Sequence, residues 1–163
     1  MSSMRWRRGR EAETLLQAAA LDELTFSLET LVVRAAHLVT GVWGERQAAA
    51  ALKKKGYRLL GRRVRMGRRD EIDLVARDGS ILVFVEVKTR AEEAFGRPVS
   101  AVDRRKRRAV SRAAVRYLRA LRSQPEAFRF DVVEVIGSPG GRDPVIRHIP
   151  NAFALDRRYD VPV

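Results

Sequence analysis

The chain has 163 residues, a length that suits one domain of ordinary size with a short extension. Hydrophobic residues make up 45% of it, which is enough for a core and argues against global disorder despite 33% charged residues. Lys and Arg number 33 against 20 Asp and Glu, and a net charge of +13 repels itself unless a polyanion neutralises it. Nucleic acid is therefore the first expected partner, and an anionic membrane surface the second.

The residue types that the chain lacks narrow the kinds of site it can build. The absence of cysteine excludes disulfides and thiolate zinc sites, and two lone histidines, His37 and His148, cannot form a histidine-rich cluster. Any metal must be held by carboxylates, which favours Mg²⁺ or Mn²⁺. The basic start of the chain is not a convincing secretory signal, and the apolar stretch 31–43 is short and interrupted by Arg34. We therefore expect a cytoplasmic protein without a membrane partner.

Helices are expected at the start of the chain. Residues 11–40 contain good helix formers with apolar residues at helical spacing, which predicts an accessory helix or two covering the domain or a partner chain. A second helix is expected from Gly44 to Lys55, ending at Gly56. Because the helical stretch 11–40 could cover a second copy of the chain, a homodimer is one of the possible assemblies.

Strand patterns follow, interrupted by one long helix. The sequence predicts strands at residues 57–65, 72–77, 81–88, 128–136 and 144–149. Ser100 and Asp103 offer a cap for a helix reaching about Ser123. This order predicts an α/β domain with a mixed central sheet flanked by helices. We divide the chain into an N-terminal helical extension (1–40), the main domain (41–155) and a C-terminal tail (156–163).

Acidic residues gather on one face of a predicted hairpin. Asp78-Gly79 is the strongest two-residue turn signal in the chain, and with it at the tip Asp73 faces Phe84. One face of the hairpin then carries the apolar residues Ile72, Leu74, Ala76, Ile81, Val83, Val85 and Val87. The other face carries Val75, Leu82 and Phe84, then Glu71, Asp73, Glu86 and Lys88 away from the turn. Asp73 and Glu86 become diagonal neighbours, with Cβ atoms about 7–8 Å apart or somewhat less, close enough to grip one cation.

This arrangement of charges predicts phosphodiester chemistry. Acids crowded beside apolar residues repel one another and resist desolvation, and a hard divalent cation resolves that conflict. Such a site can polarise a phosphoryl oxygen and activate water. Lys88 would either help to deprotonate that water or stabilise the developing charge. Glu45 heads the apolar stripe of its helix, so it is a plausible fourth member.

The basic residues form clusters of one sign. From Arg104 to Arg122 the chain has nine basic residues and no acid, which indicates a phosphate-binding surface better than a solvated face of mixed charge. The candidate nucleic-acid-binding residues are Arg62, Arg63, Arg65, Arg68, Arg69, Arg104, Arg105, Lys106, Arg108 and Arg112. Lys106 lies on the apolar stripe of its helix, so it either reaches toward the site or snorkels to solvent. Asp131, between apolar strand residues, is expected to make structural hydrogen bonds, whereas His37 and His148 are expected to be packing or surface residues.

A series of short motifs lies between about residues 44 and 153. They are Gly44-Glu45, Gly56-Tyr57, Glu71-Ile-Asp-Leu, Phe84-Val-Glu-Val-Lys88, Phe95-Gly-Arg-Pro98, Lys106, Ala114 with Tyr117-Leu118, and Arg129-Phe-Asp-Val-Val133. In order and spacing they resemble the YraN-type family of predicted endonucleases, which belongs to the restriction-endonuclease-like, PD-(D/E)xK, nucleases. The chain is similar, more loosely, to archaeal-type Holliday junction resolvases.

The resemblance implies a restriction-endonuclease-like core and a site that holds Mg²⁺. In that superfamily a helix Glu, a strand Asp and Glu-x-Lys on the next strand form the site, and these would be Glu45, Asp73, Glu86 and Lys88. The family usually has Gly before Glu-Ile-Asp, where this chain has Asp70. Residues 1–40 lie outside the resemblance.

The sequence therefore predicts a DNA endonuclease that hydrolyses phosphodiesters with Mg²⁺ or Mn²⁺, with selectivity for branched or single-stranded structures as one option. The alternative is a nucleic-acid-binding or scaffold protein that keeps this fold with little or no catalysis. A basic membrane-surface protein is the least supported hypothesis, because no amphipathic anchor with interfacial aromatics is found. The sequence does not distinguish DNA from RNA as the partner.

Overall fold

The computed structural model describes the backbone of residues 3–92 and 103–159, and side chains at residue 27, residues 29–92 and residues 103–159. The chain divides into two compact units, residues 1–39 and residues 40–163. The expected cap Ser100 and the motif at residues 95–98 lie outside the described residues.

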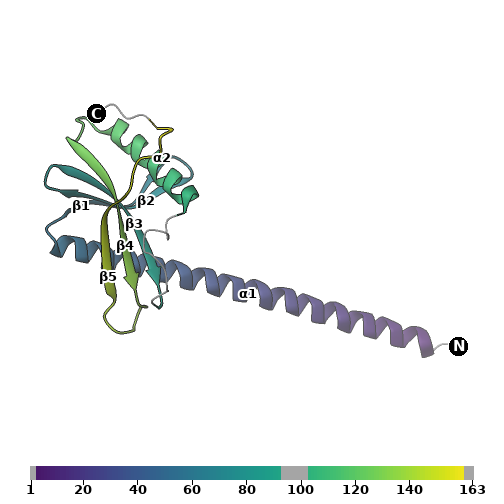
Figure 1. Cartoon of the computed structure of the whole chain (residues 1–163). Helices are drawn as coiled ribbons and strands as arrows, with labels where there is room; N and C mark the ends of the chain where they lie inside the picture. The colour runs from purple at the N-terminus through teal and green to yellow at the C-terminus, as the bar shows by residue number, and fades with distance from the viewer. Residues whose placement is uncertain (1–2, 93–102, 160–163) are drawn as a thin grey trace. The chain divides into compact units, whose positions relative to one another are not determined.

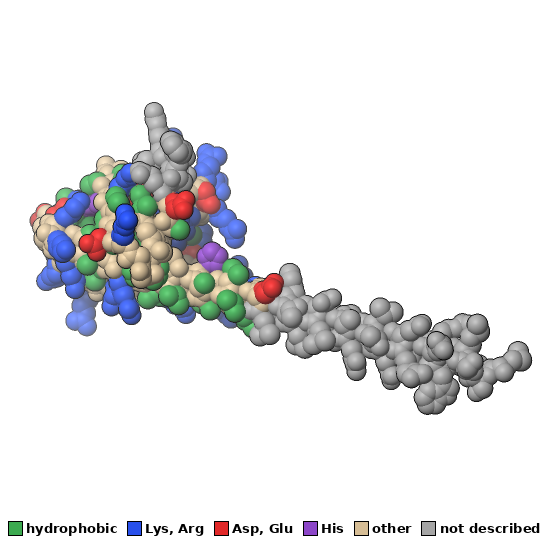
Figure 2. Space-filling view, turned by 90° about the horizontal axis from the view of Figure 1, so that it is seen from below, with side chains coloured by type: hydrophobic (Ala, Val, Ile, Leu, Met, Phe, Trp, Pro, Cys, Tyr) green, Lys and Arg blue, Asp and Glu red, His purple; other side chains and the backbone are tan. Residues whose placement is uncertain are grey.

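Helix α1 (Ser3–Lys54) is one continuous helix where the sequence predicted at least two. The expected division between the helical stretch 11–40 and the helix beginning at Gly44 is wrong, because a glycine inside a helix, such as Gly41, costs only about 1 kcal/mol relative to alanine and good helix formers flank it. Among the described side chains of the first unit, Leu31, Val32, Val33, Leu38 and Val39 are more than half exposed. Figure 2 shows apolar side chains on the surface of the described part of this helix. None of the helices, over the residues described, has the length and apolar character needed to cross a membrane.

The second unit is built on a five-stranded mixed sheet. Its strands, in order across the sheet, are β1 (Arg58–Met66), β2 (Asp70–Asp78), β3 (Ile81–Arg90), β4 (Ala127–Ile136) and β5 (Val145–Phe153). Neighbouring strands are antiparallel except for β3 and β4, which are parallel and flank helix α2 (Arg104–Ala120) in the chain. The predicted α/β class with a mixed sheet and helices packed on it is confirmed (Figure 1).

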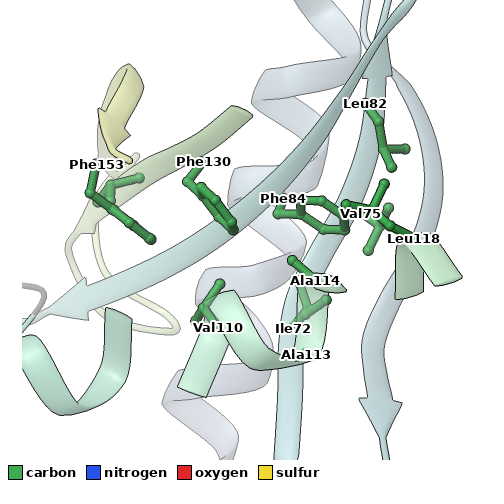
Figure 3. Close-up of a cluster of buried hydrophobic side chains, with 11 residues drawn as sticks. Ile72, Val75, Leu82, Phe84, Val110, Ala113, Ala114, Leu118, Phe130 and Phe153 are labelled. Atoms are coloured by element: carbon green, nitrogen blue, oxygen red, sulfur yellow. The ribbon is translucent and has the colours of Figure 1, made fainter. Parts of the chain in front are cut away.

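An apolar layer covers each face of the sheet. Under α2 lie Ile72, Val75, Leu82, Phe84, Phe130, Val132 and Phe153, which meet Val110, Ala113, Ala114 and Leu118 of the helix (Figure 3). Under the end of α1 lie Leu74, Val83, Val85, Val133 and Val135, which meet Ala48, Ala49 and Leu52. The prediction that Ile72 shares a face with Leu74 is wrong, because the regular alternation of β2 is broken at Asp73, between them.

Asp103 and Asp70 fix helix α2 on the sheet. Asp103 caps the helix, its Oδ1 accepting from the backbone N–H of Lys106 at 2.7 Å. Asp70, which is buried, accepts two hydrogen bonds from Arg112 at 2.6 and 2.8 Å and one from Arg116 at 2.9 Å. These hydrogen bonds, that of Arg112 first, hold the pKa of Asp70 below its ordinary value. Asp70 stands where the resembled family usually has glycine, and here it clamps α2 to the start of β2.

Candidate metal and nucleic-acid site

The β2–β3 hairpin brings Asp73 and Glu86 together in a register that differs from the predicted one. Asp78 pairs with Ile81, so the turn is Gly79-Ser80 and not Asp78-Gly79. Gly79 takes a φ of 59°, and placing glycine first in the turn avoids the penalty that a Cβ would meet there. The correction shifts each pairing by two residues, which leaves the paired side chains of the hairpin on their predicted faces, with Ile72 beyond the last pair as the exception.

Continued by one position, this register would place Asp73 opposite Glu86 instead of diagonal to it. The observed pairing of β2 with β3 ends with Leu74 opposite Val85, immediately before these two residues. At the next position the carboxylate of Asp73 replaces a backbone acceptor, since its Oδ2 accepts from the backbone N–H of Val87 at 2.8 Å. The side chain of Asp73 is thereby held against β3.

Glu86 is a buried acid whose two oxygens are in different surroundings. Its side chain is 2% exposed, and Oε1 forms an ion pair with Lys88 Nζ at 2.9 Å. Oε2 is buried and receives no hydrogen bond of good geometry from the described residues, although Lys106 Nζ lies 3.0 Å away. A buried charged oxygen without such a donor is costly and is uncommon outside functional sites.

Lys106 reaches from α2 into this acid pair. Its Nζ lies 3.0 Å from Glu86 Oε2 and 3.8 Å from Asp73 Oδ1. Of the two options that the sequence left open, the structure has the one that reaches toward the site. Burial lowers the pKa of Lys106, but the charges of Asp73 and Glu86 outweigh burial and keep that pKa above its ordinary value.

The environment of Asp73 disfavours its charge. Burial first, and the charge of Glu86 second, raise the pKa of Asp73 to about 7, although Lys106 and the Val87 N–H act in the opposite direction. Strongly shifted carboxylates of this kind gather at functional sites, because two acids in one dry location need a shared cation.

Glu45 reaches the same end of the sheet but has a different partner. Gly44 packs so closely on Thr89 of β3 that a Cβ at position 44 would overlap the Thr89 side chain. The neighbouring Glu45 accepts from Arg63 Nε with both oxygens, at 3.0 and 3.1 Å. Arg63 also lies 4.0 Å from Glu71, which links the two acids through one guanidinium. No contact joins Glu45 to Asp73 or Glu86 within the described part of the chain.

The predicted phosphate-binding residues fall into two groups. Some are already paired with acids of the domain: Arg63 with Glu45, Arg65 with Glu71 at 3.1 Å, Arg108 with Asp156 at 3.4 Å, and Arg112 with Asp70. Others have no ion pair with any described residue: Arg62, Arg68, Arg69, Arg104 and Arg105. Figure 2 shows how widely basic side chains cover the visible face of the domain.

A second buried acid, Asp131 on β4, is fully satisfied. It is 0% exposed and accepts from Arg129 Nε at 3.0 Å, from His148 Nε2 at 2.9 Å and from the backbone N–H of Asn151 at 2.9 Å. Asn151 has a φ of 51°, a left-handed conformation that asparagine tolerates. The structural role expected for Asp131 agrees with these contacts, whereas the partnership with His148 was missed because the two lie on different strands.

Comparison with known proteins places the chain in a family. The model of the uncharacterised protein family UPF0102 matches residues 44–135, which contain Glu45, Asp73, Glu86, Lys88 and Lys106. The chain belongs to this family. It is 50% identical over 113 residues to a UPF0102 protein of Symbiobacterium thermophilum, covering 69% of this chain and 94% of that protein. A UPF0102 protein of Geobacter metallireducens is 45% identical over 115 residues, covering 71% and 92%.

Proposed function

We propose that this UPF0102 protein is a metal-dependent endonuclease with a restriction-endonuclease-like core, which hydrolyses phosphodiester bonds in DNA. The observation that carries the proposal is the pairing of buried Glu86 with partly buried Asp73 on adjacent strands, where Lys88 lies 2.9 Å from one Glu86 oxygen and the other Glu86 oxygen has no good hydrogen-bond donor among the described residues. Buried polar atoms without a hydrogen bond of good geometry are rare in native structures, and a bound cation is one explanation for such an atom.

The residues fit Mg²⁺ or Mn²⁺ in number and kind. Among the described residues there is no group of three acids or histidines arranged to hold a metal ion. Mg²⁺ does not need such a group, since it usually keeps several waters and binds through one or two carboxylates plus substrate phosphates. Asp73 and Glu86 would be those carboxylates, and Glu45 would join them only after leaving Arg63.

The chemistry divides between the cation and the chain. When bound, a divalent cation neutralises phosphoryl oxygens and lowers the pKa of water. Asp73 and Glu86 would hold it, because Asp73 accepts a hydrogen bond from β3 and Glu86 is a buried residue of that strand. The Lys88 ammonium supplies a second positive charge that can stabilise the charge developing on the phosphate.

The unpaired arginines supply the nucleic-acid surface. Arg104 and Arg105 precede Lys106 on α2, and Arg68 and Arg69 lie in the β1–β2 turn that leads into the Asp73 strand. Arg104 and Arg105 thus adjoin the lysine that contacts the acid pair, and Arg68 and Arg69 come shortly before Asp73 in the chain. Their exposed guanidinium groups can bind phosphate at any DNA sequence.

The test is a cleavage assay with the purified full chain on linear, flapped and four-way DNA, in Mn²⁺ or in chelator. We expect cleavage only with the metal, and its loss in Asp73→Ala, Glu86→Ala and Lys88→Ala with DNA binding largely kept. A matched control is Asp78→Asn, which removes an acid from the turn end of β2 and should still cleave. If Glu86→Ala cuts as fast as the parent, the site is wrong. If the parent binds every substrate but cuts none, the protein is a nucleic-acid-binding or scaffold protein.

A further inference from the structure

The two carboxylates of the acid pair each have one oxygen engaged on the sheet and one directed elsewhere. Asp73 Oδ2 accepts from the Val87 N–H at 2.8 Å, and Glu86 Oε1 is paired with Lys88 at 2.9 Å. The remaining oxygens are Asp73 Oδ1 and Glu86 Oε2. Lys106 Nζ lies within 3.8 Å and 3.0 Å of these two atoms.

The Lys106 ammonium thus lies beside the two carboxylate oxygens other than those engaged by the Val87 N–H and Lys88. A divalent ion held by both carboxylates would meet the least competition at these oxygens, because the other two already have a partner on the sheet. Two cations cannot share that position, because they repel one another strongly at a separation of a few ångströms.

The Lys106 ammonium is attracted to Asp73 and Glu86 by charge, and another cation could replace it. Glu86 Oε2 receives no hydrogen bond of good geometry from the described residues, so charge attraction holds the ammonium there. The side chain of Lys106 is 34% exposed, which gives it a route to solvent. Its backbone stays in place, because Asp103 accepts from the Lys106 N–H at 2.7 Å and fixes the first turn of α2.

We infer that Lys106 is a built-in competitor of the metal ion: its ammonium neutralises Asp73 and Glu86 when no metal is bound, and a divalent cation must displace it to bind. This inference rests on the proposed metal site, and it assigns Lys106 a positioning and regulatory role rather than a place among the phosphate contacts. The lysine keeps the acid pair together without metal and sets how much cation is needed to load the site.

Three roles for Lys106 give different results on substitution. A competitor, when removed, leaves a less stable metal-free protein that binds metal more tightly. A residue that only pins α2 to the sheet, when removed, lowers stability equally with and without metal. A residue that only binds phosphate, when removed, changes DNA affinity and leaves metal affinity unchanged.

The experiment is a calorimetric titration of chelator-treated full chain with Mn²⁺ in the absence of DNA. We compare the parent with Lys106→Met and with Arg119→Met, an exposed residue near the end of α2 that changes the net charge equally. Lys106→Met should bind Mn²⁺ about tenfold more tightly than the parent, since a unit charge beside the ion is removed. Arg119→Met should stay within about twofold, because its charge is exposed and screened.

Thermal melts of the same samples give a second readout. Lys106→Met should melt at a lower temperature than the parent in chelator and show a larger Mn²⁺-induced rise. Equal or weaker Mn²⁺ binding by Lys106→Met, or an unchanged rise, overturns the inference. A variant unfolded in chelator that folds on adding Mn²⁺ supports it, whereas one that stays unfolded with Mn²⁺, in both Lys106→Met and Lys106→Gln, overturns it. Because no DNA is cut, tighter Mn²⁺ binding in a protein without nuclease activity would sink the proposed function alone.

Discussion

The sheet contains two buried acid centres that the fold treats in opposite ways. Asp131 on β4 accepts hydrogen bonds from three residues, and although burial alone would raise its pKa, those hydrogen bonds outweigh burial and lower it. Asp73 on β2 accepts from one backbone N–H and faces Glu86, and its pKa is raised to about 7. Both acids are largely buried, so burial does not separate them; the supply of donors and of opposite charge does.

The number of hydrogen bonds that the fold supplies to a buried acid separates a structural acid from a functional one. The hydrogen bonds of Asp131 tie β4 to β5 and leave nothing for a ligand to add. The pair Asp73 and Glu86 is incomplete, so a cation from outside the sheet can gain what the fold has not supplied. Such a site lowers the stability of the domain in exchange for the capacity to bind.

The largest expected effect is the loss of stability when Asp131 is removed. Asp131→Ala should lower the free energy of unfolding by about 3–5 kcal/mol, because it leaves Arg129 and His148 without their buried partner. Urea denaturation followed by circular dichroism measures the change. A loss below about 1 kcal/mol would mean that the Asp131 centre does not hold β4 and β5 together.

The contribution of Asp73 to stability should change with pH in the opposite direction to that of Asp131. The folded pKa of Asp73 lies above the ordinary value of 3.8, so the native state holds the proton more tightly and this stabilisation is lost as the pH rises through about 7. Asp73→Asn should therefore match the parent near pH 4 and become the more stable protein toward pH 8, by no more than about 4 kcal/mol. The measurement is urea denaturation of both proteins across that range in chelator. A parent that gains on Asp73→Asn as the pH rises would contradict the assignment.

A divalent metal ion should stabilise the protein only when the Asp73 and Glu86 pair is intact. A cation that binds the folded state alone adds about 2.7 kcal/mol at a hundredfold excess over its Kd. Mn²⁺ or Mg²⁺ should therefore raise the melting temperature of the parent and have little effect on Asp73→Asn. Asp78→Asn, which changes the same charge at the Arg129 end of β2, serves as the control and should keep the full response. Equal shifts in the parent and Asp73→Asn would place the ion elsewhere.

The smallest expected effects separate arginines that have no ion pair with a described residue from arginines that bind an acid of the domain. Arg104→Ala with Arg105→Ala should reduce the salt slope of duplex DNA binding by about 0.9 for each lost phosphate contact, with stability unchanged within about 0.5 kcal/mol. Arg112→Ala should instead destabilise the domain by about 1–3 kcal/mol, since it deprives buried Asp70 of two hydrogen bonds. Filter binding at several salt concentrations, with a melt of each variant, tests both. An unchanged slope in the double variant would move the DNA to another surface.

Much of the candidate site could be predicted from the hairpin sequence alone. The turn was placed one residue early, which moved each pairing by two positions, yet Asp73, Glu86 and Lys88 stayed on one face. Side chains alternate with a period of two, so an error of two leaves the faces unchanged, whereas an error of one would have reversed them. The side chain of Ile72 departs from this rule because β2 is irregular beside Asp73.

The partners of charged side chains could not be predicted in this way. The nine basic residues that begin at Arg104 looked alike in the sequence, but the structure sends Lys106 to the acid pair, Arg112 to Asp70 and Arg108 to Asp156. Each of these contacts joins residues from different elements. Their formation depends on how α2 lies on the sheet, which no local pattern specifies.

The sequence by itself determined the α/β class, the positions of the strands, the one-signed charge of α2 and the face on which the acids gather. These depend on periodicity and composition, which act between residues close together in the chain. Only the tertiary structure decided that Lys106 faces the free oxygens of Asp73 and Glu86, that Arg63 holds Glu45, and that Asp131 is satisfied by His148. The reason is physical: a long charged side chain can reach several partners, and packing of distant elements selects one of them.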